Sequence, residues 1–273
     1  MLYNNKSELL TLLRRENLYT EKKLGQNFLF NTQIIEKIIQ AADLKPTDTV
    51  VEIGPGLGIL TMELLKHVKK VITIEMDDKL IPYLKKTFKD HPNLEIRHQD
   101  ILKSQPFEGE YKVVANIPYY ITSPIISHFL QNQQGNRPSL LVLLTQLEVA
   151  QKICVKDGDH SVLSLQTQLF SNPKIIDRVA PESFLPAPSV DSAILKLETL
   201  ETPRLADTEK FLVLIKKAFS QKRKTIANGL NSLYSRDKKA WEELLEKASI
   251  SSKARPQTLS FPDWDRLLTT LSN

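Results

Sequence analysis

The 273-residue chain is poor in cysteine, glycine and long apolar runs, and two of these shortages exclude classes of protein. Its single cysteine, Cys154, excludes a disulfide framework and argues against a cysteine-based metal cluster. The longest apolar runs, such as Leu140–Leu144, are far shorter than the roughly 20 residues of a membrane-spanning helix. The first residues mix acids with bases and contain no apolar signal core. These features predict a cytoplasmic protein without a metal site or a membrane association.

The positive charge of the chain is concentrated near its end. The net charge is +5, with 14 Lys and Arg against 9 Asp and Glu in residues 201–273, whereas residues 1–200 hold 23 of each kind. This asymmetry favours a neutral body with an appendage that faces a polyanion such as a nucleic acid. A solvated helical surface without a partner is the alternative interpretation.

Apolar runs alternate with amphipathic helical stretches through the first 150 residues. After an amphipathic helix at residues 6–17 and a second one that Asn31 would cap, the alternation predicts a doubly wound, largely parallel sheet. The predicted strands are Thr49–Ile53, Val71–Glu75, Leu94–Arg97, Lys112–Ala115 and Leu140–Leu144. The last of these is continuously apolar, as in a strand buried on both faces. Ser123 and Pro124 predict the start of a further helix.

The pattern changes near residue 200. Two further runs, Lys174–Val179 and Ser192–Leu197, predict an antiparallel hairpin at the sheet edge. Only helical patterns follow, at Thr208–Phe219, Thr225–Tyr234, Lys238–Lys247 and Trp264–Leu271. We therefore expect an α/β domain in residues 1–200 and a small all-helical domain in residues 201–273.

Three of the eight glycines fall within five residues, in Gly54–Gly58. They follow a predicted strand and precede a predicted helix, where glycine allows a tight turn and brings backbone N–H groups close to a ligand. The dinucleotide fingerprint would require a glycine at Ile59, so the spacing differs from that of dehydrogenases. A tight turn without a ligand is the alternative interpretation.

Two acidic residues follow at the ends of the next strands. Glu75 lies 21 residues after Gly54, where a carboxylate can accept hydrogen bonds from both ribose hydroxyls of S-adenosylmethionine or of a nucleotide. Asp100 can accept a hydrogen bond from the adenine amine of such a ligand, while Ile101 packs on its ring. A solvated turn for Glu75 and a helix cap for Asp100 remain open.

The tetrapeptide Asn116–Tyr119, Asn-Ile-Pro-Tyr, ends the fourth predicted strand. An exocyclic adenine amine is a poor nucleophile because its lone pair is delocalised into the ring, and acceptors for its N–H groups would localise that pair. The side-chain oxygen of Asn116 and the carbonyl of Pro118 can be those acceptors and can hold the amine in line with a sulfonium methyl. Tyr119 can stack on an extruded base. A simple Asn-Pro turn is the alternative.

Five segments together resemble the ribosomal RNA adenine dimethyltransferases. They are KKLGQNFL (22–29), VEIGPGLGILT (51–61), ANIPYYITSPI (115–125), FLPAPSVDSAI (184–194) and AFSQKRKTIANGL (218–230). The resemblance implies a Rossmann-like class I methyltransferase fold with a helical domain that docks on RNA. It also implies S-adenosylmethionine as cofactor, S-adenosylhomocysteine as product, and no metal.

Within that family the chain is most similar to the small-subunit branch. The branch that acts on large-subunit RNA usually carries a lysine in the glycine loop, whereas this chain has Pro55 and Leu57. The resemblance implies dimethylation of two adjacent adenosines in the 3′-terminal hairpin loop of 16S small-subunit rRNA. The expected substrate is the immature small subunit during its biogenesis, and the enzyme is expected to be a monomer.

The resemblance also assigns residues to roles. The implied cofactor-binding residues are Gln26, Asn27, Leu29, Gly54, Gly56, Glu75, Met76, Asp100, Ile101 and Asn116. The implied reaction centre consists of Asn116, Pro118 and Tyr119. Phe184 would be the second aromatic ring around the target base, opposite Tyr119, although a core position is the alternative. Lys222, Arg223 and Lys224 would contact RNA phosphates, although a solvated helix start is the alternative for each.

The chain departs from the family pattern at two places outside the glycine loop. Leu147 stands where the family often has a lysine, and His160-Ser161 replaces the usual Tyr-Gly. Both departures put details of RNA docking in doubt rather than the chemistry.

Two other functions stay open at this point. The first is a non-catalytic ribosome-assembly or transcription factor on the same fold, and the second is a DNA adenine methyltransferase. The glycine loop and Asn116–Tyr119 argue against the first. The second shares the amine chemistry and would be separated by the choice of acceptor.

Overall fold

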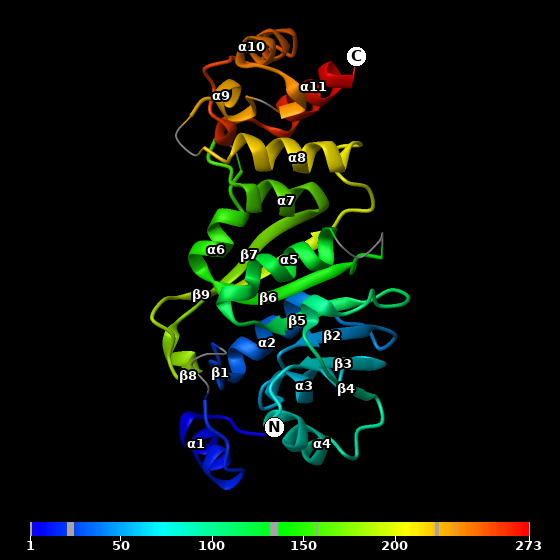
Figure 1. Cartoon of the computed structure of the whole chain (residues 1–273). Helices are drawn as coiled ribbons and strands as arrows, with labels where there is room; N and C mark the ends of the chain where they lie inside the picture. Colours follow the sequence, from blue (N-terminus) through cyan, green and yellow to red (C-terminus); the bar gives the residue numbers. More distant parts are fainter. Residues whose placement is uncertain are drawn as a thin grey trace. The chain divides into compact units, whose positions relative to one another are not determined.

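A computed structural model describes residues 2–20, 25–131, 136–156, 158–221, 224–231 and 233–272. The chain, drawn in Figure 1, divides into two units. The first unit comprises Met1–Ala150 and Pro173–Thr199, and the second comprises Gln151–Asn172 and Leu200–Asn273.

A seven-stranded sheet with the order β4-β3-β2-β5-β6-β9-β7 is built largely from the first unit. Its strands are β2 (Thr49–Ile53), β3 (Lys70–Glu75), β4 (Leu94–His98), β5 (Lys112–Asn116), β6 (Leu140–Gln146), β7 (Ser171–Val179) and β9 (Ser192–Thr199). Neighbouring strands from β4 to β6 are parallel, whereas β9 is antiparallel to β6. The predicted α/β class and the predicted strands β7 and β9 at the sheet edge are therefore confirmed.

The apolar pattern explains which strands lie in the core. Leu141–Leu144 in β6 are completely buried, as predicted for a strand covered on both faces. The helices of this unit are α1 (Lys6–Arg15), α2 (Thr32–Ala42), α3 (Ile59–Leu64), α4 (Leu80–Thr87), α5 (Thr122–Gln131) and α6 (Leu147–Ile153), the last of which crosses into the second unit. Asn31 caps α2 as predicted, since its side chain accepts a hydrogen bond from the Gln33 N–H.

The predicted start of α5 at Ser123 and Pro124 is wrong. A 3₁₀ turn at Tyr119–Ile121 leads directly into α5, which begins at Thr122. The hydroxyl of Thr122 donates a hydrogen bond to the Tyr119 carbonyl and also lies within hydrogen-bond distance of the buried Thr145 hydroxyl. The backbone is therefore helical before the predicted cap is reached.

A short second sheet pairs two segments that are far apart in the sequence. Strands β1 (Phe28–Leu29) and β8 (Phe184–Leu185) run antiparallel, with Leu29 opposite Phe184. Residues 25–27 lead directly into β1, and the Asn27 carbonyl accepts a hydrogen bond from Asn116 at the end of β5, so this segment lies beside the main sheet.

The second unit consists mainly of helices. They are α7 (Val162–Phe170), α8 (Thr208–Ala218), α9 (Ile226–Leu230), α10 (Lys238–Lys247) and α11 (Phe261–Ser272). Trp241, Trp264 and Phe211 are completely buried among them. The unit resumes at Leu200, where the sequence predicted a boundary, but it also contains Gln151–Asn172, which the prediction placed in the first domain. The physical reason is that α7 packs against α8.

Candidate functional site

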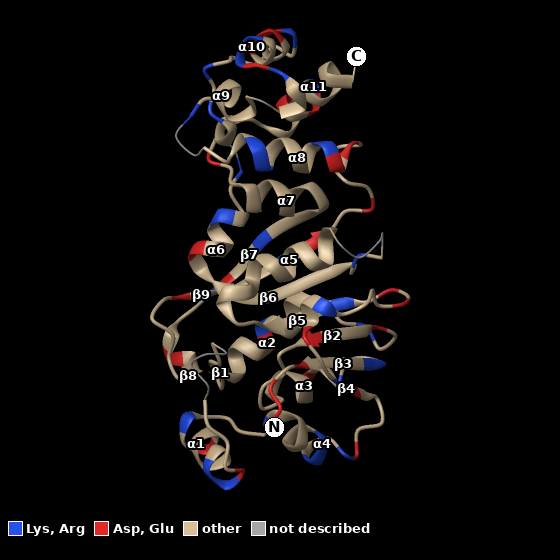
Figure 2. Cartoon of the chain, viewed as in Figure 1, with Lys and Arg blue, Asp and Glu red and all other residues tan. Residues whose placement is uncertain are grey.

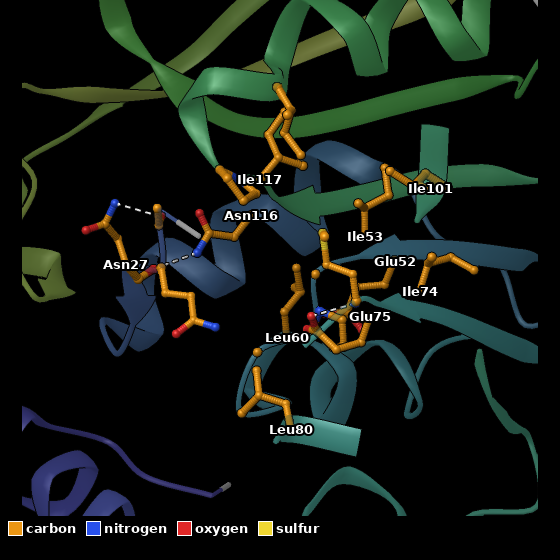
Figure 3. Close-up of a pocket in the computed structure, with 18 of the residues that line it drawn as sticks. Asn27, Glu52, Ile53, Leu60, Ile74, Glu75, Leu80, Ile101, Asn116 and Ile117 are labelled. Carbon is orange, nitrogen blue, oxygen red and sulfur yellow. Dashed lines mark hydrogen bonds between the residues drawn. The ribbon is translucent and has the colours of Figure 1, made fainter. Parts of the chain in front are cut away.

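The carboxyl ends of the parallel strands surround a cavity of about 280 Å³. Parallel strands present their carboxyl ends at one edge, where α/β folds bind ligands. The predicted cofactor and reaction-centre residues that line this cavity are Gln26, Asn27, Leu29, Gly54, Gly56, Glu75, Met76, Asp100, Ile101, Asn116, Pro118 and Tyr119. Figure 3 shows Asn27 and Asn116 on one side of the cavity and Glu75 on the other. The fold therefore brings together residues that are up to 93 positions apart, from Gln26 to Tyr119.

The glycine loop joins β2 to α3 with its backbone facing the cavity. Gly54 and Gly56 have φ angles of 62° and 57°, which disfavour residues with a side chain. A Cβ atom at Gly56 would lie 3.1 Å from the ring of Phe28, whereas a Cβ at Gly54 would meet nothing within 4 Å. Behind the loop, the Tyr83 hydroxyl donates to the Leu57 carbonyl at 3.2 Å.

Glu75 ends β3 and is 7% exposed. Its Oε1 accepts hydrogen bonds from the backbone N–H groups of Met76 and Asp77, at 2.8 and 2.9 Å. Burial raises the pKa of this carboxyl above its ordinary value, and the same backbone bonds oppose that rise. The bonds fix the carboxylate in the cavity wall, and the alternative of a solvated turn acid does not hold.

Asp100 lies in the cavity wall and also caps a short helix. Its side chain accepts a hydrogen bond from the Leu102 N–H at 3.0 Å, at the start of the 3₁₀ helix Ile101–Lys103. A role of Asp100 as a helix cap is therefore compatible with a role as an acceptor for the adenine amine of a ligand. Ile101 is buried at 5% exposure, whereas Met76 is 53% exposed.

Asn116 is oriented by the segment that precedes β1. Its side-chain Nδ2 donates to the backbone carbonyl of Asn27 at 3.1 Å (Figure 3). This bond uses the donor end of the amide, so Oδ1 is the end that can serve as an acceptor. Gln26 is held in the same region, since its Nε2 donates to Asp77 at 2.7 Å.

Pro118 and Tyr119 begin the turn that leads into α5. The Pro118 carbonyl accepts a hydrogen bond from the Ile121 N–H at 3.2 Å, and a carbonyl oxygen has a second lone pair for another donor. The Tyr119 hydroxyl lies 2.5 Å from the hydroxyl of Ser192 on β9. Burial raises the pKa of Tyr119, so the phenol stays protonated. Ser192 therefore fixes the direction of the Tyr119 ring.

Phe184 is not among the residues that line the described cavity. It is 2% exposed, pairs with Leu29 and belongs to the apolar core. Its predicted stacking on a base stays a prediction. Lys222 and Arg223 lie outside the described residues, and Lys224 is exposed in the second unit.

Glu52, Tyr3 and Tyr120 are among the cavity-lining residues that the sequence analysis did not assign to the site. Glu52 on β2 is 1% exposed and accepts a hydrogen bond from the Thr61 hydroxyl at 2.5 Å. Tyr3 is also 1% exposed and comes from the segment before α1. Tyr120 lines the cavity but is 60% exposed. An acid two residues before the glycine loop was a visible signal for Glu52, whereas no local pattern pointed to Tyr3.

The part of the chain that the structure describes contains neither a candidate metal site nor a candidate membrane-spanning helix. No group of three or more His, Cys, Asp or Glu side chains there could hold a metal ion. None of the described helices has the length and apolar character needed to cross a membrane.

The chain is similar to proteins that modify ribosomal RNA. The family model for ribosomal RNA adenine dimethylase matches residues 17–265. Ribosomal RNA small subunit methyltransferase A of Dehalococcoides mccartyi is 42% identical over 257 residues, which cover 92% of this chain and 88% of that protein. The protein of the same name from Clostridium botulinum is 40% identical over 255 residues, covering 90% and 92%.

Solved structures agree with this relationship. A dimethyladenosine transferase from Plasmodium falciparum has a TM-score of 0.78 and 31% identity, covering 90% of this chain and 97% of its own. The 23S rRNA methyltransferase ErmE has a TM-score of 0.72 and 30% identity, covering 90% and 100%. The chain belongs to the ribosomal RNA adenine dimethylase family and is an enzyme with the Rossmann-like methyltransferase fold.

Proposed function

We propose that this enzyme uses S-adenosylmethionine to dimethylate the N6 amines of two adjacent adenosines in the 3′-terminal hairpin loop of 16S small-subunit rRNA. The observation that carries the chemistry is the Asn116 amide, whose donor end is bonded to Asn27 in the wall of the cavity. The small-subunit relatives, at 40 to 42% identity, favour that branch over the 23S enzyme, at 30%.

The residues of the cavity fit S-adenosylmethionine. Glu75 is a buried carboxylate that can accept from the ribose hydroxyls, and the absence of a side chain at Gly54 leaves room for a ligand beside the glycine loop. Met76 and Ile101 offer apolar contacts for the adenine ring, and Asp100 offers an acceptor for its amine. When bound, this cofactor supplies a methyl group on a positively charged sulfur. The proposal requires no metal.

The reaction centre acts on the amine of the target adenine. Asn116 Oδ1 and the Pro118 carbonyl accept its two N–H groups, which localises the nitrogen lone pair and orients it toward the methyl group. The Tyr119 ring, directed by Ser192, stacks on the extruded base. No general base is needed, because the ammonium product is acidic and loses its proton to water.

The second unit would bind the RNA backbone. In Figure 2 parts of the α8 and α10 ribbons carry the colour of Lys and Arg, and Lys216 and Lys217 lie in the last turn of α8. Together with Lys222, Arg223 and Lys224 they would neutralise phosphates, so binding should weaken as salt rises. The proposed substrate is the immature small subunit. We propose that the enzyme acts on it in the cytoplasm and as a monomer.

Transfer of a tritiated methyl group tests the proposal. The acceptors are small ribosomal subunits that lack adenine methylation, large subunits, and a DNA hairpin of matching sequence, and the modified bases are mapped by mass spectrometry. We expect N6,N6-dimethyladenosine at two adjacent positions of the small-subunit RNA. Transfer to DNA or large subunits alone would contradict the proposed substrate, and no transfer to any acceptor would indicate a non-catalytic factor.

A further inference from the structure

Tyr120 is an exposed aromatic residue at the mouth of the cavity. Its side chain is 60% exposed although it lines the cavity together with the neighbouring Tyr119. Packing of the core therefore does not explain a large ring at this position. Ligand cavities are commonly lined by aromatic side chains, so an exposed ring in the lining is available for contact with a ligand.

The ring of Tyr120 is supported from one side. A Cβ atom built on Gly25 would lie 3.3 Å from Cε1 and 3.4 Å from Cδ1 of Tyr120, so one edge of the ring rests against the Gly25 backbone. A side chain at position 25 would crowd this edge. The remaining ring surface faces solvent.

Tyr119 and Tyr120 differ in the direction of their rings. Both belong to the 3₁₀ turn Tyr119–Ile121, in which successive side chains point about 120° apart. Tyr119 is half-buried and its hydroxyl contacts Ser192, whereas Tyr120 rests on Gly25. The turn therefore offers one ring inside the cavity wall and a second ring at the entrance.

An RNA that delivers one base into the cavity must bring its neighbour to the entrance. Extrusion of the target adenine removes its stacking on adjacent bases, and an exposed aromatic ring can replace part of that stacking. We propose that Tyr120 binds, by stacking, the unpaired base of the nucleotide next to the adenosine that is being methylated. This inference rests on the proposed function. In the proposed substrate the neighbouring base is the second target adenine, so Tyr120 would bind that adenine while the first one is methylated.

Three variants test this role. Tyr120→Ala removes the ring, Tyr120→Phe keeps it without the hydroxyl, and Tyr19→Ala is a matched control, because Tyr19 is 76% exposed and outside the cavity lining. We expect Tyr120→Ala to raise the KM for unmethylated small subunits about tenfold, the range of a lost base–aromatic stack. Its affinity for S-adenosylmethionine, measured by calorimetry, should not change. Tyr120→Phe and Tyr19→Ala should behave as the wild type.

A second substrate identifies the partner of the ring. Small subunits are reconstituted with RNA that carries an abasic nucleotide beside the adenosine to be methylated. The KM of the wild type should rise on this substrate by the same factor by which Tyr120→Ala raises the KM on natural subunits. The KM of Tyr120→Ala should be the same on both substrates. On natural subunits, Tyr120→Ala should also increase the share of RNA in which only one of the two adenosines is modified.

The outcomes separate the two proposals. If the wild type methylates RNA and Tyr120→Ala has an unchanged KM, the stacking role is overturned and the proposed function stands. Additive losses from the variant and the abasic nucleotide would also overturn it. If the wild type transfers no methyl group to RNA, both proposals fall together.

Discussion

Replacing Glu52 by Gln should change how the stability of the protein depends on pH. Burial raises the pKa of this carboxyl from an ordinary 4.5 to about 8, the Thr61 hydroxyl opposes the rise, and nearby Glu75 adds to it. Glu52 is 1% exposed, with Glu75 and Tyr3 as the other ionisable groups near it. The folded protein therefore holds a proton on Glu52 at neutral pH.

The sign of the effect follows from proton counting. In the unfolded chain Glu52 is ionised above about pH 4.5, whereas in the folded chain it keeps its proton up to about pH 8. Unfolding thus releases a proton in this window, so the contribution of Glu52 is fully present below pH 4.5 and is lost as pH rises toward 8. The contribution of Glu52 to the free energy of unfolding should fall by about 1.4 kcal/mol for each pH unit within the window.

Urea unfolding of the cofactor-free protein at several pH values from about 5 to about 8 measures this contribution. Gln is neutral at every pH and keeps an oxygen that can accept from Thr61, while all other titrating groups are shared by the two proteins. We expect the stability of the wild type to fall relative to Glu52→Gln as pH rises. Parallel curves for the two proteins would refute a protonated Glu52.

Three further substitutions test the site and the second unit. Asn116→Ala should abolish tritium transfer and leave cofactor affinity at most moderately weakened, because the amide orients the target amine; a wild-type transfer rate would refute that role. Glu75→Ala should strongly weaken S-adenosylmethionine binding in calorimetry, since the ribose hydroxyls lose their acceptor; unchanged affinity would count against this assignment. Gly229→Ala should destabilise the second unit by about 1–3 kcal/mol in thermal unfolding, because its Cβ would lie 2.5 Å from the Ala218 carbonyl oxygen. An unchanged melting temperature would contradict that close approach.

Much of the site was readable from the sequence because its parts are local. The glycine loop, Glu75 and Asn116 each follow an apolar run, and parallel strands must bring such positions to one edge of the sheet. The partners of these residues were not readable. Asn27 orients Asn116, and Ser192 orients Tyr119 from 73 positions away.

The sequence by itself determined the alternation of the five parallel strands with helices, the cavity edge and the chemical groups available there, since each depends on residues close together in the chain. Only the tertiary structure decided the protonation of Glu52, the burial of Tyr3 and Phe184, and the packing of α7 against α8. The physical reason is that burial, pKa and side-chain direction depend on contacts between distant segments, for which a local pattern contains no information.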